Sequence, residues 1–155
     1  MSLPDPFYLD ESDPGSWKML NTFSLKVKEA GTAAGLEHKL IELINVRISH
    51  LNGCACCLDM HSKMVLEADE TSQRLAVLAT WRETALFSEL EAAALSVEEA
   101  TTTLPDSETR ISELAASGLV LKDAQLSAIQ WDSIAISAFN RVSILSQHTM
   151  RPSAK

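Results

Sequence analysis

The sequence predicts an all-α protein, a compact bundle of about six or seven helices. Three observations favour this class. Only five glycines and five prolines interrupt the 155 residues. No strand-like alternation of apolar and polar residues lasts more than a few positions. Apolar residues recur instead at helical spacing, most clearly between Leu40 and Leu51, where they form a stripe along one face.

The expected helices follow from local start and stop signals. The first begins after Pro14 and Gly15, and the second ends at Asn52 and Gly53, which form a C-terminal stop signal. Ser88 and Glu91 form a capping-box pattern at the start of a later helix. The spacing predicts seven helices, over about residues 16–30, 36–51, 55–68, 72–79, 88–101, 109–116 and 122–147.

The length predicts one domain over residues 16–155, preceded by an N-terminal arm over residues 1–15. A chain of this size buries roughly 70% of the surface that its unfolded form exposes. Hydrophobic residues make up 46% and charged residues 22%, which is ordinary for a globular protein. We therefore expect it to fold without a metal or a disulfide, and this leaves its cysteines free for chemistry.

The composition and charge of the chain limit the classes of partner that it is expected to bind. A formal net charge of −8 repels phosphate backbones, so nucleic acid is not expected to bind. The apolar runs are far shorter than the ~20 residues of a membrane span. Residues 1–15 have neither a basic start nor an apolar stretch, so no signal peptide is expected. The expected location is the cytoplasm, with no membrane partner.

All three cysteines lie within four residues, at positions 54, 56 and 57. The disulfides of a secreted scaffold need an even number of cysteines, and these are usually spread along the chain. A cluster of three in a reducing compartment indicates redox chemistry or metal binding.

Cys54 and Cys57 form a C-x-x-C pair at the expected start of a helix. Unpaired N–H groups and the positive end of the helix dipole stabilise a thiolate there. At ~100° per residue, Cys54, Cys57 and His61 share one helical face. His61 is therefore placed to exchange a proton with the dithiol. Cys56 should point elsewhere, as a packed side chain.

Other interpretations of these residues remain open at this stage. Glu42 stands in an apolar stretch and is a candidate to orient His61, but alone it fits a solvated residue paired with Lys39 or Arg47. Cys54, Cys57, His61 and Glu42 are also a conceivable zinc ligand set, although the usual second C-x-x-C or His pair is missing. Purely structural cysteines are a further alternative.

One segment resembles a known family. It reads Glu42-Leu43-Ile44-x-x-Arg47-Ile48-Ser49-x-Leu51-Asn52-Gly53-Cys54-x-x-Cys57-x-x-x-His61. This is similar to the core signature of the alkylhydroperoxidase D-like proteins, within the carboxymuconolactone decarboxylase superfamily. The resemblance extends over roughly residues 17–147 and implies a core motif over residues 36–80. It is supported by Trp81-Arg82-Glu83, Phe87-Ser88-Glu89 and Phe139-Asn140-Arg141.

The resemblance implies an all-α oligomer, such as a dimer, trimer or hexamer, with peroxidase activity. It implies that Cys57 attacks a peroxide and that Cys54 then closes a disulfide, with Glu42 and His61 as the proton relay. A dithiol reductant, such as a lipoyl protein, would reopen the disulfide. The helix dipole alone favours Cys54 as the attacking thiol, whereas closeness to His61 favours Cys57.

Two positions depart from the family pattern. Cys56 stands where relatives often carry His or Tyr, and Ala68-Asp69-Glu70 stands at a turn where glycine is usual. The residues alone leave open a redox role for Cys56 and whether His50, Arg47 or Arg141 lines the site.

The sequence thus favours a thiol-dependent peroxidase that acts on a hydroperoxide or another small molecule, with no cofactor and no metal. The catalytic residues are expected to be Cys57, Cys54, His61 and Glu42. One alternative is a lactone decarboxylase of the carboxymuconolactone type, which has no need of a C-x-x-C pair. Another is a metal-binding or structural module without catalytic activity.

Overall fold

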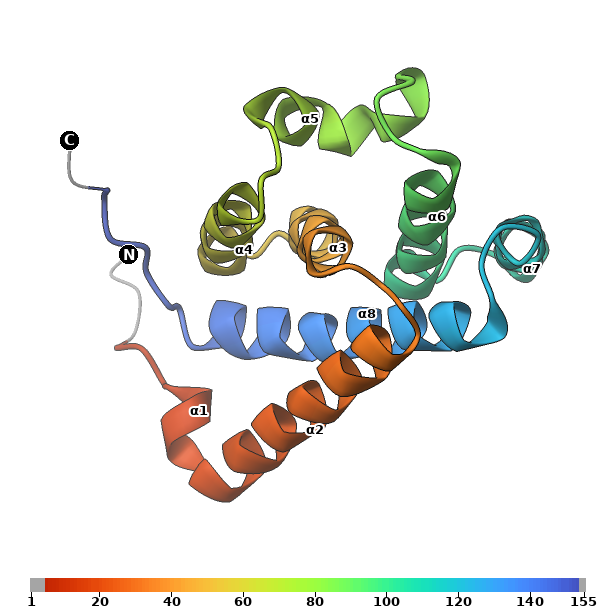
Figure 1. The fold of residues 1–155 in the computed structure, drawn as a ribbon. Helices are drawn as coiled ribbons and strands as arrows, with labels where there is room; N and C mark the ends of the chain where they lie inside the picture. The colour runs from red at the N-terminus through yellow and green to blue at the C-terminus, as the bar shows by residue number, and fades with distance from the viewer. Residues whose placement is uncertain (1–4, 154–155) are drawn as a thin grey trace.

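The computed structural model describes residues 5–153, which contain helices and no strand, so the predicted all-α class is confirmed (Figure 1). None of the helices in this range is both long enough and apolar enough to cross a membrane. The elements are α1 (Leu9–Ser12), α2 (Pro14–Ala33), α3 (His38–Asn52), α4 (Ala55–Glu67), α5 (Ser72–Val77), the 3-10 helix η1 (Leu78–Glu83), α6 (Glu89–Thr103), α7 (Ser107–Ser117) and α8 (Asp123–Leu145).

The described residues hold two more helical elements than the seven expected from the sequence. One is η1, which follows directly after α5 and itself contains a kink at Thr80. The other is α1, whose first backbone amide, at Leu9, donates a hydrogen bond to Ser146 Oγ at 2.9 Å. Because such a short helix depends on a distant partner, local sequence signals do not reveal it. Of the expected arm over residues 1–15, residues 1–4 lie outside the described range.

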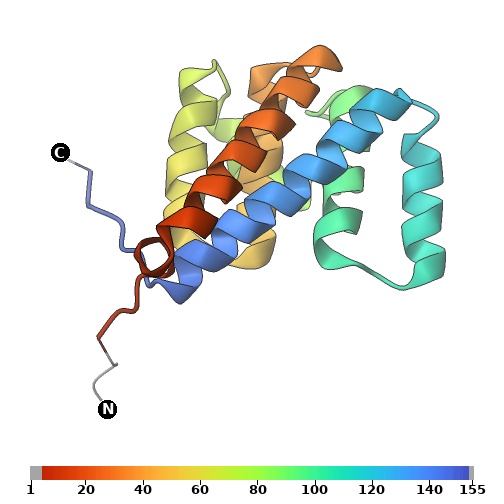
Figure 2. The same cartoon turned by 90° about the horizontal axis from the view of Figure 1, so that it is seen from below.

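Helix α3 lies at the centre of the fold and packs against α4, α6 and α8. In Figure 1, α8 runs between α3 on one side and α2 on the other. Figure 2 shows α2 and α8 side by side and antiparallel. The pairs Trp17–Phe139 and Phe23–Trp131, which meet edge to face, fix this antiparallel register. Helices α2 and α8 therefore form an outer layer over the α3–α4 pair.

The position of α3 explains its nearly continuous apolar sequence. One side packs in a cluster with α6 and α8 through residues such as Ile44 and Ile48. The other side packs in a second cluster with α4, η1 and α6 through Leu43 and Val46. A helix surrounded by neighbours has no solvated face, so the polar residues among these apolar ones become buried as well. Glu42 is one of them, with a fully buried side chain.

The turn after α4 contains an aspartate at the position where the family pattern usually has glycine. Asp69 has a φ of +64°, in the left-handed region where relatives were expected to carry glycine. Aspartate tolerates this region better than most residues because its short side chain can bond locally. The helix end that the family resemblance implies is therefore compatible with this sequence.

Candidate active site

The dithiol lies where α3 ends and α4 begins. Gly53 caps α3 with a φ of +70°, a left-handed conformation that reverses the chain with little strain for glycine. Cys54 follows in an extended conformation as the N-cap of α4, and its Sγ accepts a hydrogen bond from the Cys57 amide at 3.3 Å. The predicted helix start at the cysteines is therefore found one residue after Cys54.

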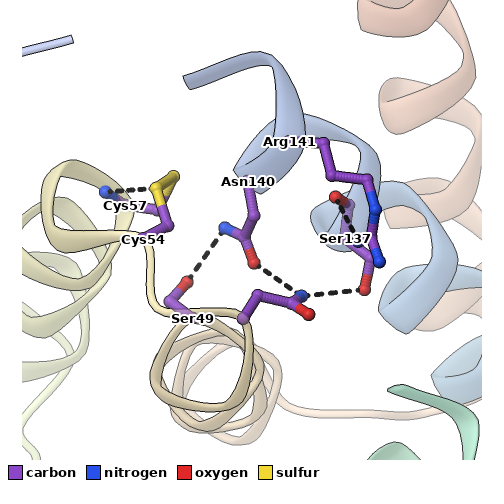
Figure 3. Close-up of a disulfide and its surroundings, with 7 residues drawn as sticks. Ser49, Cys54, Cys57, Ser137, Asn140 and Arg141 are labelled. Carbon is purple, nitrogen blue, oxygen red and sulfur yellow. Dashed lines mark hydrogen bonds between the residues drawn. A yellow bond between two sulfur atoms is a disulfide. The ribbon is translucent and has the colours of Figure 1, made fainter. Parts of the chain in front are cut away.

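Cys54 and Cys57 are joined as a disulfide, with their Cα atoms 5.3 Å apart (Figure 3). This separation lies in the usual range for disulfides. Cys54 is 1% exposed and Cys57 is 7% exposed. The two sulfurs thus differ in surroundings, since Cys57 lines a pocket and Cys54 lies beneath it.

Glu42 and His61 form a buried pair beside the dithiol. His61 Nδ1 lies 2.7 Å from Glu42 Oε2, and both side chains are almost completely shielded from solvent. The alternative of a solvated Glu42 paired with Lys39 or Arg47 is therefore wrong. An ionised carboxylate that accepts the Nδ1 proton orients the ring and leaves Nε2 free for other groups.

A pocket of about 330 Å³ opens over Cys57 and His61, between α2, α4 and α8. Helix α4 contributes four residues to it, at positions 56, 57, 60 and 61. Helix α2 contributes one stripe at helical spacing, and α8 with the following segment forms the remaining wall. The residues that line the pocket from α2 and from α8 with its following segment are Trp17, Asn21, Ser24, Lys28, Ile136, Phe139, Val142, Ser143 and His148.

Several of these lining residues were not expected from the sequence. Trp17 and His148 are two of them. His148 is half-buried, its Nε2 lies 3.3 Å from Asp10 Oδ1, and its ring stacks on Tyr8. The i, i+4, i+7, i+11 spacing of the α2 stripe was a usable signal, but it does not say which helix the stripe faces.

Cys56 also lines the pocket, so the expectation that it points away from the site is wrong. The helical wheel was measured from Cys54, which lies outside α4 in an extended conformation. Within α4, Cys56 and Met60 form one i, i+4 pair, and Cys57 and His61 form the adjacent pair. All four side chains face the pocket, and Cys56 is a half-buried free thiol.

Asp132 is a buried acid that sequence analysis missed. It lies on α8, 7% exposed, and its Oδ2 has no hydrogen-bond partner in the described part of the chain. Burial, and then the nearby Glu42 carboxylate, raises the pKa of Asp132 to about 7, while Lys28 lowers it. The available signal was its position in the apolar stripe of Ile129 and Ile136, where a solvated acid does not fit.

Arg47 lies outside the pocket. Its Nε donates to Glu99 Oε1 at 2.7 Å, and Trp81 Nε1 donates to the same oxygen at 2.9 Å. His50 is also absent from the pocket lining, and its pKa is lowered by burial and then by the charge of Arg47. Arg47 belongs to the packing between α3, η1 and α6.

Asn140 fixes the end of α3 next to the dithiol. It accepts a hydrogen bond from Asn52 Nδ2 at 2.9 Å and donates one to Ser49 Oγ at 3.3 Å. Arg141 extends away from the disulfide and bonds the carbonyl of Ser137 at 3.1 Å (Figure 3). Asn140 thus connects α8 to the last turn of α3, while Arg141 does not line the site.

The ligand set considered for zinc does not assemble in this geometry. Across residues 5–153, no three side chains of His, Cys, Asp or Glu are arranged to hold a metal ion. Two of the four candidate ligands, Cys54 and Cys57, bond to each other.

Residues 18–100, which contain Glu42, His61 and the dithiol, match the sequence pattern of the carboxymuconolactone decarboxylase family. The chain belongs to this family. The uncharacterized Bacillus subtilis protein YdfG is 44% identical over 64 residues, 41% of this chain and 44% of YdfG. The uncharacterized Escherichia coli protein YnjA is 36% identical over 63 residues, 41% of this chain and 35% of YnjA. Each match spans less than half of the relative.

The fold matches a solved structure over nearly its whole length. An Agrobacterium tumefaciens protein of unknown function, named as a candidate AhpD antioxidant defence protein, superposes with a TM-score of 0.83. The match covers 97% of this chain and 100% of that protein at 24% sequence identity. The likeness establishes an alkylhydroperoxidase D-like fold. Membership of the carboxymuconolactone decarboxylase family supports an enzymatic role of the peroxidase or the decarboxylase type.

Proposed function

We propose that the protein is a thiol peroxidase that reduces organic hydroperoxides through the Cys54–Cys57 dithiol. The observation that carries the proposal is that Cys57 and His61 line the same pocket while Glu42 holds the far side of the imidazole. A lactone decarboxylase has no use for a dithiol, so the Cys54–Cys57 disulfide supports the peroxidase role over that alternative.

The proposed cycle begins with proton transfer from the Cys57 thiol to His61 Nε2. The thiolate attacks the distal peroxide oxygen, the O–O bond breaks, and His61 returns the proton to the departing alkoxide, which leaves as an alcohol. Cys57 is then a sulfenic acid. The Cys54 thiol displaces its hydroxyl group as water and forms the disulfide. A dithiol reductant reopens this bond and is itself oxidised to a disulfide.

The pocket supports an organic substrate rather than hydrogen peroxide alone. Its volume of about 330 Å³ is within the range of small-molecule sites, whereas a water-sized oxidant occupies only ~30 Å³. Much of the wall is apolar, through residues such as Phe139, Val142 and Met60. We therefore propose a hydroperoxide with an apolar body as the substrate.

We further propose that the protein works as a homo-oligomer. Large apolar side chains remain exposed on the outer layer, including Met19 at 66% and Leu25 at 63% on α2 and Trp131 at 51% and Ile134 at 47% on α8. Isolated exposed apolar residues are ordinary, but several on two adjacent helices are typical of an interface. A second copy of this chain is the proposed partner, in keeping with the family resemblance.

The test is a thiol count after a single turnover. Reduced protein mixed with cumene hydroperoxide should lose two thiols per chain, and dithiothreitol should restore them. Cys57→Ser should abolish peroxide consumption. Cys54→Ser should stop at a sulfenic acid on Cys57, which dimedone traps and mass spectrometry detects.

Cys56→Ser is the matched control for the loss of a neighbouring thiol. It should retain the loss of two thiols per chain, because the pair that forms the disulfide is intact. Peroxide consumption by Cys57→Ser at the rate of the parent protein would show that the proposed function is wrong.

A further inference from the structure

We propose that Asp132 is a positioning residue, the second carboxylate of the proton relay, whose ionisation controls how strongly His61 draws the proton from Cys57. The order of groups is Asp132, Glu42, His61 and Cys57. The inference deepens the proposed function and rests on it only in taking His61 as the base that serves Cys57.

Asp132 lies on α8 where this helix packs against α3, the helix that carries Glu42, and both carboxylates are buried. Ile41 and Ile44, on either side of Glu42 in the sequence, line one small cavity together with Asp132. Each of the two buried carboxylates has an oxygen without a hydrogen-bond partner in residues 5–153, Oε1 of Glu42 and Oδ2 of Asp132. The other oxygen of Glu42 contacts His61. Buried polar atoms are usually paired, so each unpaired one requires an explanation.

Beside Asp132 lies a cavity of about 10 Å³, roughly the space of one water-sized probe. Its other lining residues are apolar or glycine, from α2, α3, α8 and the α2–α3 loop, with the exception of Lys28. Lys28 also lines the large pocket. The charged groups that act on Asp132 are therefore Glu42 from α3 and Lys28 from α2.

These surroundings hold a proton on Asp132 into the neutral range. Asp132 is mostly uncharged below pH 7 and carries a negative charge above it. The added charge lies next to Glu42 and stabilises the imidazolium form of His61. Glu42 contacts His61 directly, whereas neither carboxylate lines the pocket together with Cys57. The proposal therefore takes the effect of the added charge on the imidazolium to exceed its repulsion of the thiolate.

The consequence is a dithiol that becomes more reactive as Asp132 loses its proton. A cationic His61 favours the thiolate of Cys57. The reactivity of Cys57 should therefore rise in two steps with pH, one from the thiol itself and one near pH 7 from Asp132.

Alkylation by iodoacetamide measures this without a peroxide. The protein with Cys54→Ser and Cys56→Ser keeps Cys57 as its single thiol, and its alkylation rate is followed from pH 5 to pH 9. Adding Asp132→Asn should remove the step near pH 7. The rate should then be roughly three- to tenfold lower at pH 8 and unchanged at pH 5.5, as expected for one charge at an effective dielectric constant near 20.

Two further variants separate this role from a structural one. Lys28→Met removes the cation that lowers the pKa of Asp132, so the step should move to higher pH. Asp123→Asn makes the same charge change at an exposed position of α8 and should leave the profile unchanged. Lys28→Met also tests the proposal if Asp132→Asn fails to fold.

The proposal is overturned if Asp132→Asn retains both steps, or if it slows alkylation by the same factor at every pH. It is also overturned if Lys28→Met leaves the step in place. Failure of the peroxidase role would appear separately, as hydroperoxide consumption that survives Cys57→Ser.

Discussion

Glu42 Oε2 and His61 Nδ1 lie 2.7 Å apart although 19 residues separate them in the chain. We expect Glu42→Gln to keep a hydrogen bond to the imidazole but to remove the charge that stabilises its protonated form. The single-turnover loss of thiols with cumene hydroperoxide should slow by roughly 10–100-fold, within the usual range for general-base catalysis. Stopped-flow measurement at pH 7 checks this, and an unchanged rate would remove Glu42 from the relay.

Asp132→Asn is expected to stabilise the folded protein while impairing its chemistry. The pKa of Asp132 is raised from 3.8 to about 7, so the folded state holds a proton that the unfolded state releases. The stabilising effect of that proton is complete below pH 3.8 and is lost as pH rises through about 7. At pH 8 the substitution should therefore add on the order of 4 kcal/mol to the free energy of unfolding. Urea denaturation at pH 5 and pH 8 should show the gain growing with pH.

Glu98→Gln should also stabilise the folded protein, and it should leave the dithiol unchanged. Glu98 is fully buried, and desolvation, followed by the charge of Glu99, raises its pKa well above the usual range. The folded state again binds the extra proton, so the parent protein should lose stability as pH rises past the ordinary titration of glutamate. Thermal unfolding from pH 5 to pH 8 should show a shallower decline for the variant. A steeper decline would mean that the carboxylate is paired in solution.

Gly53→Ala should strain the turn that presents the dithiol. An added methyl group meets no atom within 4 Å, but the φ of +70° costs a non-glycine residue about 1 kcal/mol. Gly35 is a matched control, since its φ is +78° and its surroundings are equally open. Both variants should lose similar stability in urea denaturation. Only Gly53→Ala should change the reduction potential of Cys54–Cys57, and equal potentials in both variants would contradict this.

Charged substitutions on the outer layer should weaken the proposed self-association. Leu25→Lys on α2 and Ile134→Lys on α8 each place a charge at an exposed apolar position. Light scattering after size-exclusion chromatography should give a lower mass for both than for the parent protein. Lys63→Glu, on α4 and remote from this layer in sequence, serves as a charge-changing control. A parent protein that is monomeric at all concentrations would contradict the oligomer.

Local signals predicted most of the fold. The Gly53 stop and the Ser88–Glu91 capping box both lie at real helix ends. The start of α2 was expected two residues late, because Asp13 caps the helix and Pro14 occupies its first turn. The missing information concerned tertiary contacts, as in α1, whose amide bond to Ser146 spans almost the whole chain.

The sequence predicted the part of the site that comes from residues close together in the chain. Cys54, Cys57 and His61 lie within eight residues of each other, so helical spacing brings them together. Lys28 lines the same pocket only because α2 packs against α8, which itself packs against α3 and α4. Periodicity shows that a residue faces a neighbour, but it does not show which neighbour. The predicted orientation of the Cys56 side chain was wrong because Cys54 was treated as part of the helix.

The buried position of Cys54 also constrains how the proposed cycle is completed. Cys57 is the sulfur that lines the pocket, so a reductant must attack the disulfide at Cys57 and release the thiol of Cys54. The oxidant and the reductant then use one entrance in turn and compete for the free pocket. A cysteine on the flat surface of a globular partner does not reach that depth. The reductant that suits the proposed cycle is slender, either a small free dithiol or one carried at the tip of a flexible arm.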